Sequence, residues 1–309
     1  MELPMNKVKP VNSRESWVTD HSNIQSNLDD LAKIAKEKNK NETLVLTDGV
    51  YHLDKPLVVT GGVSLVSEGG GRRSARLVFS NVQSDTALVT VKNCNGVVFD
   101  GINIKAFGEA DRVIGLLSDS NSSATFSNFD IELQLGNDCI GLKHWRDEKW
   151  GESCIYERFD IRSEGACVEI QSGDNNQFRD FDCRAGTKVV DGVSAVFRFA
   201  ENSVPHSVVI GPGSAQKGNH AYYCNSVSNS ISGGMITFRD YRWEQPETKD
   251  TVAFLHTPKR KDGESGHVTE RVNFIGCRNS RVNQAVKIEN TLRTRILGCY
   301  LDGSKDLGK

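Results

Sequence analysis

Short alternations of hydrophobic and polar residues fill most of this 309-residue chain. Between Asp138 and Ala185 one unit occurs twice: a short apolar-alternating strand, a polar turn, and a second strand that contains Phe-Asp. Cys139 and Cys167 open the two copies, which gives an expected period of 28 residues. Self-similarity at such a period is the sequence signature of a solenoid. We therefore expect a repetitive, elongated fold.

The same unit can be followed through the rest of the chain. First strands are expected to begin near Ala87, Val113, Cys139, Cys167, Ala195, Ala221, Thr251 and Ala285. One column of aromatic or apolar residues in the second strands contains Phe99, Phe126, Tyr156, Phe178, Val208 or Ile210, Phe238, Phe274 and Ile296, and a second contains Ile102, Phe129, Phe159, Phe181, Tyr241 and Cys277. Such columns would stack inside a coil whose parallel rungs lie about 4.8 Å apart.

The N-terminal part has a different pattern. Residues 1–22 are polar and are expected to form an arm or linker. Residues 23–38 carry Ile24, Leu28, Leu31, Ile34 and Ala35 at helical spacing, which predicts one amphipathic helix. An apolar helix face at this position would close the open end of a solenoid, whose backbone edge otherwise invites strand pairing. We expect one domain over residues 23–309, with the helix as a cap and rungs over about 42–303.

Composition narrows the classes of function. A formal net charge of −2 and a pI near 6.4 leave no basic surface for nucleic acid or an anionic membrane. No segment has the length and apolarity of a membrane span or of a secretory signal, so synthesis in a cytoplasm without a signal peptide is expected. The eight cysteines include no CxxC pair and are predicted to be small buried thiols. No metal site or cofactor is predicted, because the histidines share no ligand spacing.

Three stretches resemble a known family. The run TLVLTDGVYHLDKPLVVTGGVSLVSEGG, which follows the predicted helix, resembles the opening of pectin-lyase-like β-helix proteins, and VVFDGINI and SGDNNQFRDFDC are similar to ordinary rungs of that superfamily. The resemblance implies an all-β fold, a right-handed parallel β-helix with a short N-terminal capping helix. With its polar arm and no signal peptide, the chain looks most like a phage tailspike or tail-fibre depolymerase. This resemblance implies a homotrimer in a virion tail, joined to other tail proteins through the arm, that binds bacterial surface polysaccharide and cleaves it as a glycoside hydrolase or a lyase.

Two outward columns could carry chemistry. Asp130, Asp160 and Asp182 each follow an inward phenylalanine and should face outward together. Acids on neighbouring rungs would be about 4.8 Å apart, and acids two rungs apart about 9.6 Å, which brackets the carboxylate spacings of retaining and inverting glycosidases. The alternative is a solvated face on which Arg162 and Arg184 neutralise the acids.

The first strands predict a more varied outward column. Its members are Leu117, Lys143, Gln171, Arg198, Asn225, Leu255 and Glu289, with Glu169 and Tyr223 one step earlier. Mixed polar residues suit sugar hydroxyls, although a merely soluble sheet face is the alternative. GNDCIGLK resembles the GDDC segment of polygalacturonase-type hydrolases, which would make Asp138 a catalytic acid. Since Asn137 replaces the first acid of that pair, Asp138 could instead be a turn residue.

The resulting hypothesis names a set of site residues. Asp138, Glu169 and Asp182 are the predicted catalytic acids. The predicted substrate-binding residues are Lys143, Trp145, Trp150, Gln171, Arg198 and Trp243, with the three tryptophans expected in exposed turns where indole rings can stack on sugars. Two alternatives stay open: a non-catalytic structural or adhesin module of a virion, and a bacterial pectin-lyase-like enzyme that acts on polysaccharide.

Overall fold

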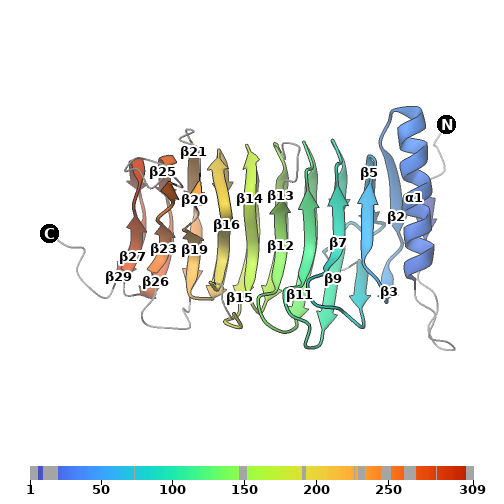
Figure 1. Ribbon diagram of the computed structural model, residues 1–309, viewed down its shortest axis with the longest axis horizontal. Coiled ribbons are helices and arrows are strands. Elements are labelled where there is room, and N and C mark those ends of the chain that lie inside the picture. Colours follow the sequence, from blue (N-terminus) through green and yellow to red (C-terminus); the bar gives the residue numbers. More distant parts are fainter. Residues whose placement is uncertain are drawn as a thin grey trace.

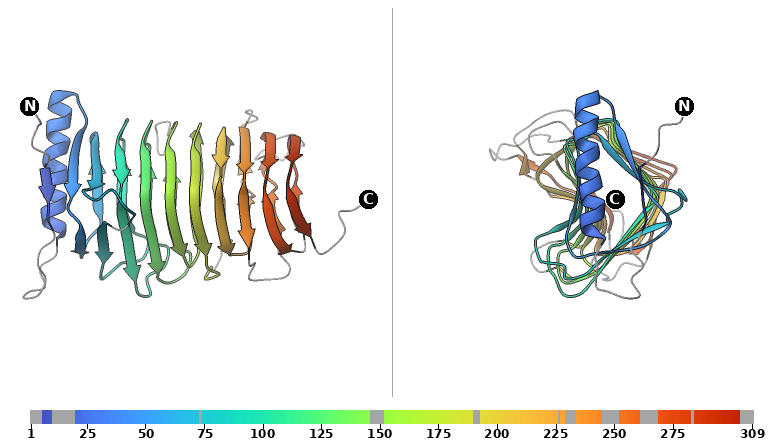
Figure 2. Two further views of the ribbon diagram at one scale, coloured as in Figure 1. Left: turned by 180° about the vertical axis from the view of Figure 1, so that it is seen from behind. Right: turned by 90° about the vertical axis from the view of Figure 1, so that its right-hand side faces the viewer.

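The chain forms a right-handed parallel β-helix with one α-helix at its N-terminal end, as a computed structural model shows (Figure 1). The structure describes residues 6–9, 20–72, 74–145, 152–189, 193–225, 227–228, 234–244, 252–260, 269–282 and 284–303. Every strand pairing among these residues is parallel, and neighbouring strands in each sheet belong to successive rungs. Three faces of the coil therefore run along its axis and enclose the core (Figure 2).

Face 1 is a separate nine-stranded sheet. Its strands are β4 (Leu57–Thr60), β7 (Ala87–Lys92), β10 (Ile114–Asp119), β12 (Ile140–Trp145), β14 (Ala166–Asp174), β16 (Ala195–His206), β19 (His220–Cys224), β23 (Val252–His256) and β27 (Gln284–Ile288). From β7 to β27, each strand begins within one residue of the position that the sequence pattern predicts. The repeat of first strands is confirmed.

Faces 2 and 3 are joined into one larger sheet by three long strands that contribute to both: β11 (Thr125–Gln134), β13 (Ile155–Ser163) and β15 (Gln177–Ala185). Face 2 also contains β2 (Glu42–Leu46), β5 (Val63–Ser67), β8 (Val98–Asp100), β17 (Val208–Ile210), β21 (Gly234–Arg239), β25 (Thr269–Ile275) and β28 (Thr291–Leu297). Face 3 also contains β3 (Gly49–Leu53), β6 (Ala75–Phe79), β9 (Ile102–Phe107), β18 (Gly213–Lys217), β22 (Tyr241–Glu244), β26 (Arg278–Val282) and β29 (Tyr300–Gly303). A further pair, β20 (Val227–Ser228) and β24 (Lys259–Arg260), lies outside the three faces.

A single residue makes the corner between faces 2 and 3 in the long strands. Asn128, Arg158 and Asp180 stand between register-paired residues of β11, β13 and β15, and each has a positive φ, between 50° and 54°. This left-handed backbone turns the strand without ending it, and asparagine and aspartate tolerate it better than most residues. Further along the coil, Asp240 lies between β21 and β22, and Gly276 lies between β25 and β26. Both residues also have a positive φ.

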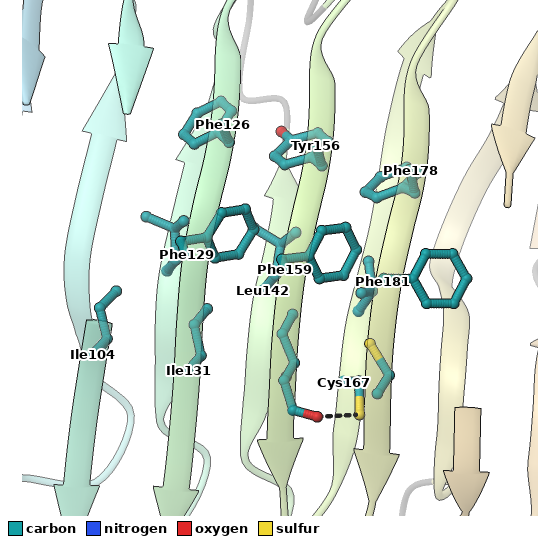
Figure 3. Close-up of a cluster of buried hydrophobic side chains, with 14 of the residues drawn as sticks. Ile104, Phe126, Phe129, Ile131, Leu142, Tyr156, Phe159, Cys167, Phe178 and Phe181 are labelled. Atoms are coloured by element: carbon teal, nitrogen blue, oxygen red, sulfur yellow. Dashed lines mark hydrogen bonds between the residues drawn. The ribbon is translucent and has the colours of Figure 1, made fainter. Parts of the chain in front are cut away.

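The two predicted columns form the inner stack. Phe126, Tyr156 and Phe178 lie ring over ring, with centroids 4.8 and 4.7 Å apart, and Phe129 lies 5.1 Å from Phe159 (Figure 3). Strand register places Ile210, not Val208, next to Phe178 in the first column. All these rings are fully buried, and each contributes both apolar burial and favourable ring contacts.

The N-terminal cap is confirmed. Helix α1 (His21–Lys38) begins two residues before the predicted start and ends where predicted. It buries Ile24, Leu28, Leu31 and Ala35 on the first rung, and Asn39 ends it in a left-handed conformation. Part of the expected arm also belongs to the coil, because β1 (Asn6–Val8) pairs with β2 and buries Val8. Residues 1–5 and 10–19 of the predicted arm lie outside the described residues.

The cysteines are free thiols, seven of them buried, as the sequence predicts. The period that Cys139 and Cys167 suggest is wrong, because the two residues are not register partners. Ile140 pairs with Ala166, so the strands are offset by 26 residues. Cys139 lies in the turn before β12, whereas Cys167 is inside β14, and this two-residue difference explains the error.

Two buried histidines form hydrogen-bonded networks inside the coil. His144 Nδ1 lies 2.7 Å from the hydroxyl of Tyr156, which donates to Ser118 Oγ at 2.8 Å. His256 lies between the hydroxyl of Tyr222, 3.0 Å from Nδ1, and Thr269 Oγ1, 2.8 Å from Nε2. Burial lowers the pKa of His256 from 6.5 to about 3, so its ring is neutral in the folded protein.

Candidate functional site

Face 3 carries the row of acids that the sequence predicts. Asp130 is paired with Asp160, and Asp160 with Asp182, so the three carboxyl groups occupy equivalent outward positions on consecutive rungs. Neighbouring rungs of a parallel sheet are about 4.8 Å apart. The phenylalanines that precede the acids point into the core, and this alternation directs the acids outward. We call Asp130, Asp160 and Asp182 the acid row.

A groove runs past Asp130 and Asp160, two members of the acid row, across β6, β9, β11 and β13. Its volume is about 250 Å³. It is lined by Arg76, Asn103, Lys105, Asp130, Ile131, Glu132, Asp160 and Arg162. A second hollow of about 350 Å³ shares Glu132 and Arg162 with it and continues to Arg184 and Lys217. The two hollows therefore form one elongated polar surface along face 3, which we call the face 3 groove.

Side chains of both charge signs line the groove. Lys105 Nζ lies 2.5 Å from Glu132 Oε2, and this hydrogen bond lowers the pKa of Glu132. Arg162 lies 3.6 Å from Asp160 on the same strand. Arg184 donates to Gln216 Oε1 at 2.7 Å, so its guanidinium faces a neutral amide. The groove thus offers both hydrogen-bond donors and hydrogen-bond acceptors to an elongated polar ligand.

Asp160 has the most unusual environment of the acid row. Burial raises its pKa above the ordinary value; Arg162 opposes this shift, and the negative charges of Asp130 and Asp182 reinforce it. A carboxyl group that holds its proton more firmly, between two other carboxyl groups, suits the role of general acid. The sequence places Asp160 in the correct row, but the three predicted catalytic residues do not include it. The Phe-Asp repeat was the signal that could have identified it.

Face 1 holds a different cluster. Glu169 is paired in register with both Lys143 and Arg198, and its two oxygens lie 2.7 Å from Lys143 Nζ and 2.6 Å from Arg198 Nε. Only 6% of Glu169 is exposed. Burial raises its pKa, but the two cations outweigh burial and lower it. Lys143 also lies 4.4 Å from the ring centre of Trp145. We call Lys143, Glu169 and Arg198 the face 1 triad.

The register of face 1 differs from the predicted outward column. It runs Lys143, Glu169, Arg198, Tyr223 and Leu255, so Glu169 and Tyr223 belong to the column itself and not one step before it. Gln171 is two residues further along β14, so it is not in the same row; its Oε1 is buried and accepts no hydrogen bond from the described residues. The prediction was wrong because it used the 28-residue period of the cysteines.

The predicted catalytic acids lie apart from one another. Glu169 is on face 1 and Asp182 is on face 3, where the hydroxyl of Ser214 donates to it at 3.0 Å. Asp138 is in the turn before β12, with φ 55° and its N–H bonded to Lys188 O at 2.9 Å. The geometry of Asp138 is that of a turn residue.

Trp243 was predicted to be exposed, and this prediction is wrong. It is fully buried, and its Nε1 donates to Lys217 O at 2.9 Å. On β22 it alternates with outward Arg242, and its register partner on the preceding rung is the small Ala215, which leaves room for the indole ring. Trp145 is half-buried at the end of β12, and Trp150 lies outside the described residues.

Among the described residues, no group of three or more histidine, cysteine, aspartate or glutamate side chains is arranged to hold a metal ion. No helix in the described part of the chain is both long enough and apolar enough to span a membrane.

Comparison with solved structures identifies similar folds. No protein-family model matches the sequence, and no curated protein matches it. A polygalacturonase from Erwinia carotovora ssp. carotovora is similar with a TM-score of 0.54 and 11% identity, over 97% of this chain and 94% of that one. A hyperthermoactive exopolygalacturonase from Thermotoga maritima has a TM-score of 0.52 and 12% identity, over 98% and 93%. ORF18 of Geobacillus virus E2 has a TM-score of 0.53 and 11% identity over 92% of this chain, which spans 57% of that protein. At these identities the likeness concerns the fold, and the chain shares the right-handed parallel β-helix of all three.

Proposed function

We propose that the protein binds a polysaccharide along the face 3 groove and hydrolyses it, with Asp160 as the general acid. The observation that carries the proposal is the position of Asp160, whose pKa is raised, between two carboxyl groups in an elongated polar groove. The polygalacturonases that share the fold act on a polysaccharide according to their names, which supports this class of substrate.

The spacing of the acids favours a retaining reaction. Adjacent rungs place two carboxyl groups near the 5–5.5 Å separation that is typical of retaining glycosidases. In the proposed reaction Asp160 protonates the oxygen of the glycosidic bond, and Asp182, the most exposed of the three acids, attacks the anomeric carbon. Water then hydrolyses the glycosyl-enzyme, with Asp160 acting as the base. The face 1 triad has no part in this scheme, because both oxygens of Glu169 are engaged by cations.

The test is a panel of bacterial surface polysaccharides and polygalacturonate, with released reducing ends as the readout. Asp160→Asn should lower the rate by about 10²- to 10⁴-fold, the usual contribution of a general acid, and should leave binding intact. Asp30→Asn, on the exposed side of α1, is the matched control and should keep full activity. Unsaturated products would indicate a lyase, and full activity in Asp160→Asn would overturn the assignment.

We further propose that the protein is a tailspike-like receptor-binding protein of a virion, which assembles as a homotrimer and attaches through its N-terminal segment. The shared fold of a virus protein supports this proposal. Multi-angle light scattering should give three times the chain mass of 34.1 kDa. Binding of capsule without release of sugars would instead favour a non-catalytic adhesin. A monomer that cleaves polysaccharide would favour a bacterial enzyme.

A further inference from the structure

Two neighbouring members of the acid row have partners of different kinds. Asp160 lies 3.6 Å from the guanidinium of Arg162. Asp182 accepts a hydrogen bond of 3.0 Å from the hydroxyl of Ser214, and it forms no ion pair with any described residue. A hydroxyl group orients a carboxylate without neutralising its charge, whereas a cation does both. Asp182 is therefore held in place and keeps its full negative charge.

The fold places Ser214 directly beside Asp182. Strand β18 pairs with the second half of β15, and the register sets Ser214 opposite Asp182. The pairing begins at Gly213, where a Cβ atom would lie 2.5 Å from the ring of Phe181. Only glycine lets β18 approach β15 this closely without moving the buried ring. The residue that follows is thereby brought within hydrogen-bond distance of the carboxyl group.

Ser214 and Asp160 lie on opposite sides of Asp182. Asp160 is its register partner on the preceding rung, and Ser214 is its partner on the following rung. The hydroxyl of Ser214 donates to Oδ1 of Asp182, and no described residue donates to Oδ2. One oxygen of the carboxylate is thus held, and the other is available to a substrate that lies along face 3.

We propose that Ser214 is a positioning residue for Asp182 in the retaining hydrolysis proposed above, on which this role depends. In the first step Oδ2 of Asp182 bonds to the anomeric carbon, the bond from that carbon to the glycosidic oxygen breaks, and the proton of Asp160 passes to this oxygen. In the second step water attacks the anomeric carbon, its proton passes to Asp160, and the bond to Oδ2 breaks. Ser214 orients the carboxylate for the first step and stabilises the charge that returns to it in the second.

The test compares kcat and KM of the parent, Ser214→Ala and Ser214→Thr on the polysaccharide of the panel that the parent cleaves fastest, with released reducing ends as the readout. Ser214→Ala should lower kcat about 10- to 100-fold, the loss expected for one hydrogen bond to a charged group, and should leave KM nearly unchanged. Ser214→Thr keeps the hydroxyl and should restore most of kcat. A threonine variant as slow as the alanine variant would overturn the role.

Sodium azide separates positioning from general damage to the site. In Asp182→Gly, azide can attack the anomeric carbon in place of the missing carboxylate, while Asp160 protonates the leaving oxygen, and the product is a glycosyl azide. Adding Ser214→Ala to this variant should not lower the azide-dependent rate further, because Ser214 then has no carboxylate to hold. An equal loss in both backgrounds would overturn the role.

The matched control is Ser127→Ala. Ser127 donates to Asp100 Oδ1 at 2.5 Å between neighbouring rungs in the same way, but on face 2 and away from the acid row. This variant should keep the kcat of the parent. A parent that cleaves no polysaccharide of the panel would overturn the proposed function and the role of Ser214 with it. An active parent with an equally active Ser214→Ala would overturn the role of Ser214 alone.

Discussion

Replacement of His256 should remove a defined part of the acid sensitivity of the fold. The ring is buried between Tyr222 and Thr269, and burial lowers its pKa from 6.5 to about 3. In the unfolded chain the same ring takes up a proton near pH 6.5. Between pH 6.5 and pH 3 the unfolded state therefore binds more protons than the folded state, so stability falls as the pH falls.

The size of the effect follows from the two pKa values. Each pH unit within the window is worth about 1.4 kcal/mol, so the loss between pH 7 and pH 5 should be about 2 kcal/mol for this one group. His256→Gln retains a side chain that can bond to both hydroxyls but does not titrate. The variant should be less stable than the parent at pH 7 and should lose about 2 kcal/mol less between pH 7 and pH 5.

The assay is guanidinium chloride unfolding at both pH values and constant ionic strength, with CD and fluorescence compared as a test of two-state behaviour. His21→Gln is the control, because that ring lies on the exposed side of the molecule and bonds to Pro56 O. Other titrating groups act in parent and variant alike, so the difference between them isolates His256. Equal losses in the parent and in His256→Gln would refute the reasoning.

Three further predictions concern the core, the face 1 triad and the groove. Phe159→Ala should lower the free energy of unfolding by about 3–5 kcal/mol, because it opens a cavity in the ring stack, whereas Phe107→Ala on the surface should have little effect in the same denaturation experiment. Glu169→Gln leaves two facing cations without their shared partner and should cost about 3 kcal/mol, measured by the same method; no loss would mean that the cations are solvated independently. If Asp160 is the general acid, activity should fall as the pH rises through its raised pKa, and Asp130→Asn should move this fall to lower pH; an unchanged pH–rate profile would contradict the role.

The sequence predicts the coil well, because the fold depends on features that repeat along the chain. The first-strand positions, the inner columns and the cap follow from local alternation and helical spacing alone. Register is harder to predict, since the turns vary in length: Thr125 pairs with Ile155 and Ile155 with Gln177, so successive offsets are 30 and 22 residues. If the predicted offset is wrong by two residues, each side chain is still predicted to point inward or outward correctly, but it is assigned to another row.

The candidate site is hard to predict from the sequence for the same reason. The Phe-Asp repeat reveals the acid row, but Arg76 and Asn103 join the groove only through the stacking of rungs that are distant in the sequence. The burial of Trp243 depends on the small Ala215 on the preceding rung. Neither fact is visible in the segment that carries the residue, because both arise from pairing between rungs.

The one-residue corners at Asn128, Arg158 and Asp180 have a consequence for the length scale of the surface. Because each long strand turns at a single residue, the strands of face 3 begin in step, and the rows of side chains do not drift from one rung to the next. Equivalent side chains on face 3 therefore recur about every 4.8 Å along the axis of the coil. A linear polymer whose own repeat is close to that value would meet equivalent groups at each unit, whereas one with a different repeat would fall out of alignment with successive rungs.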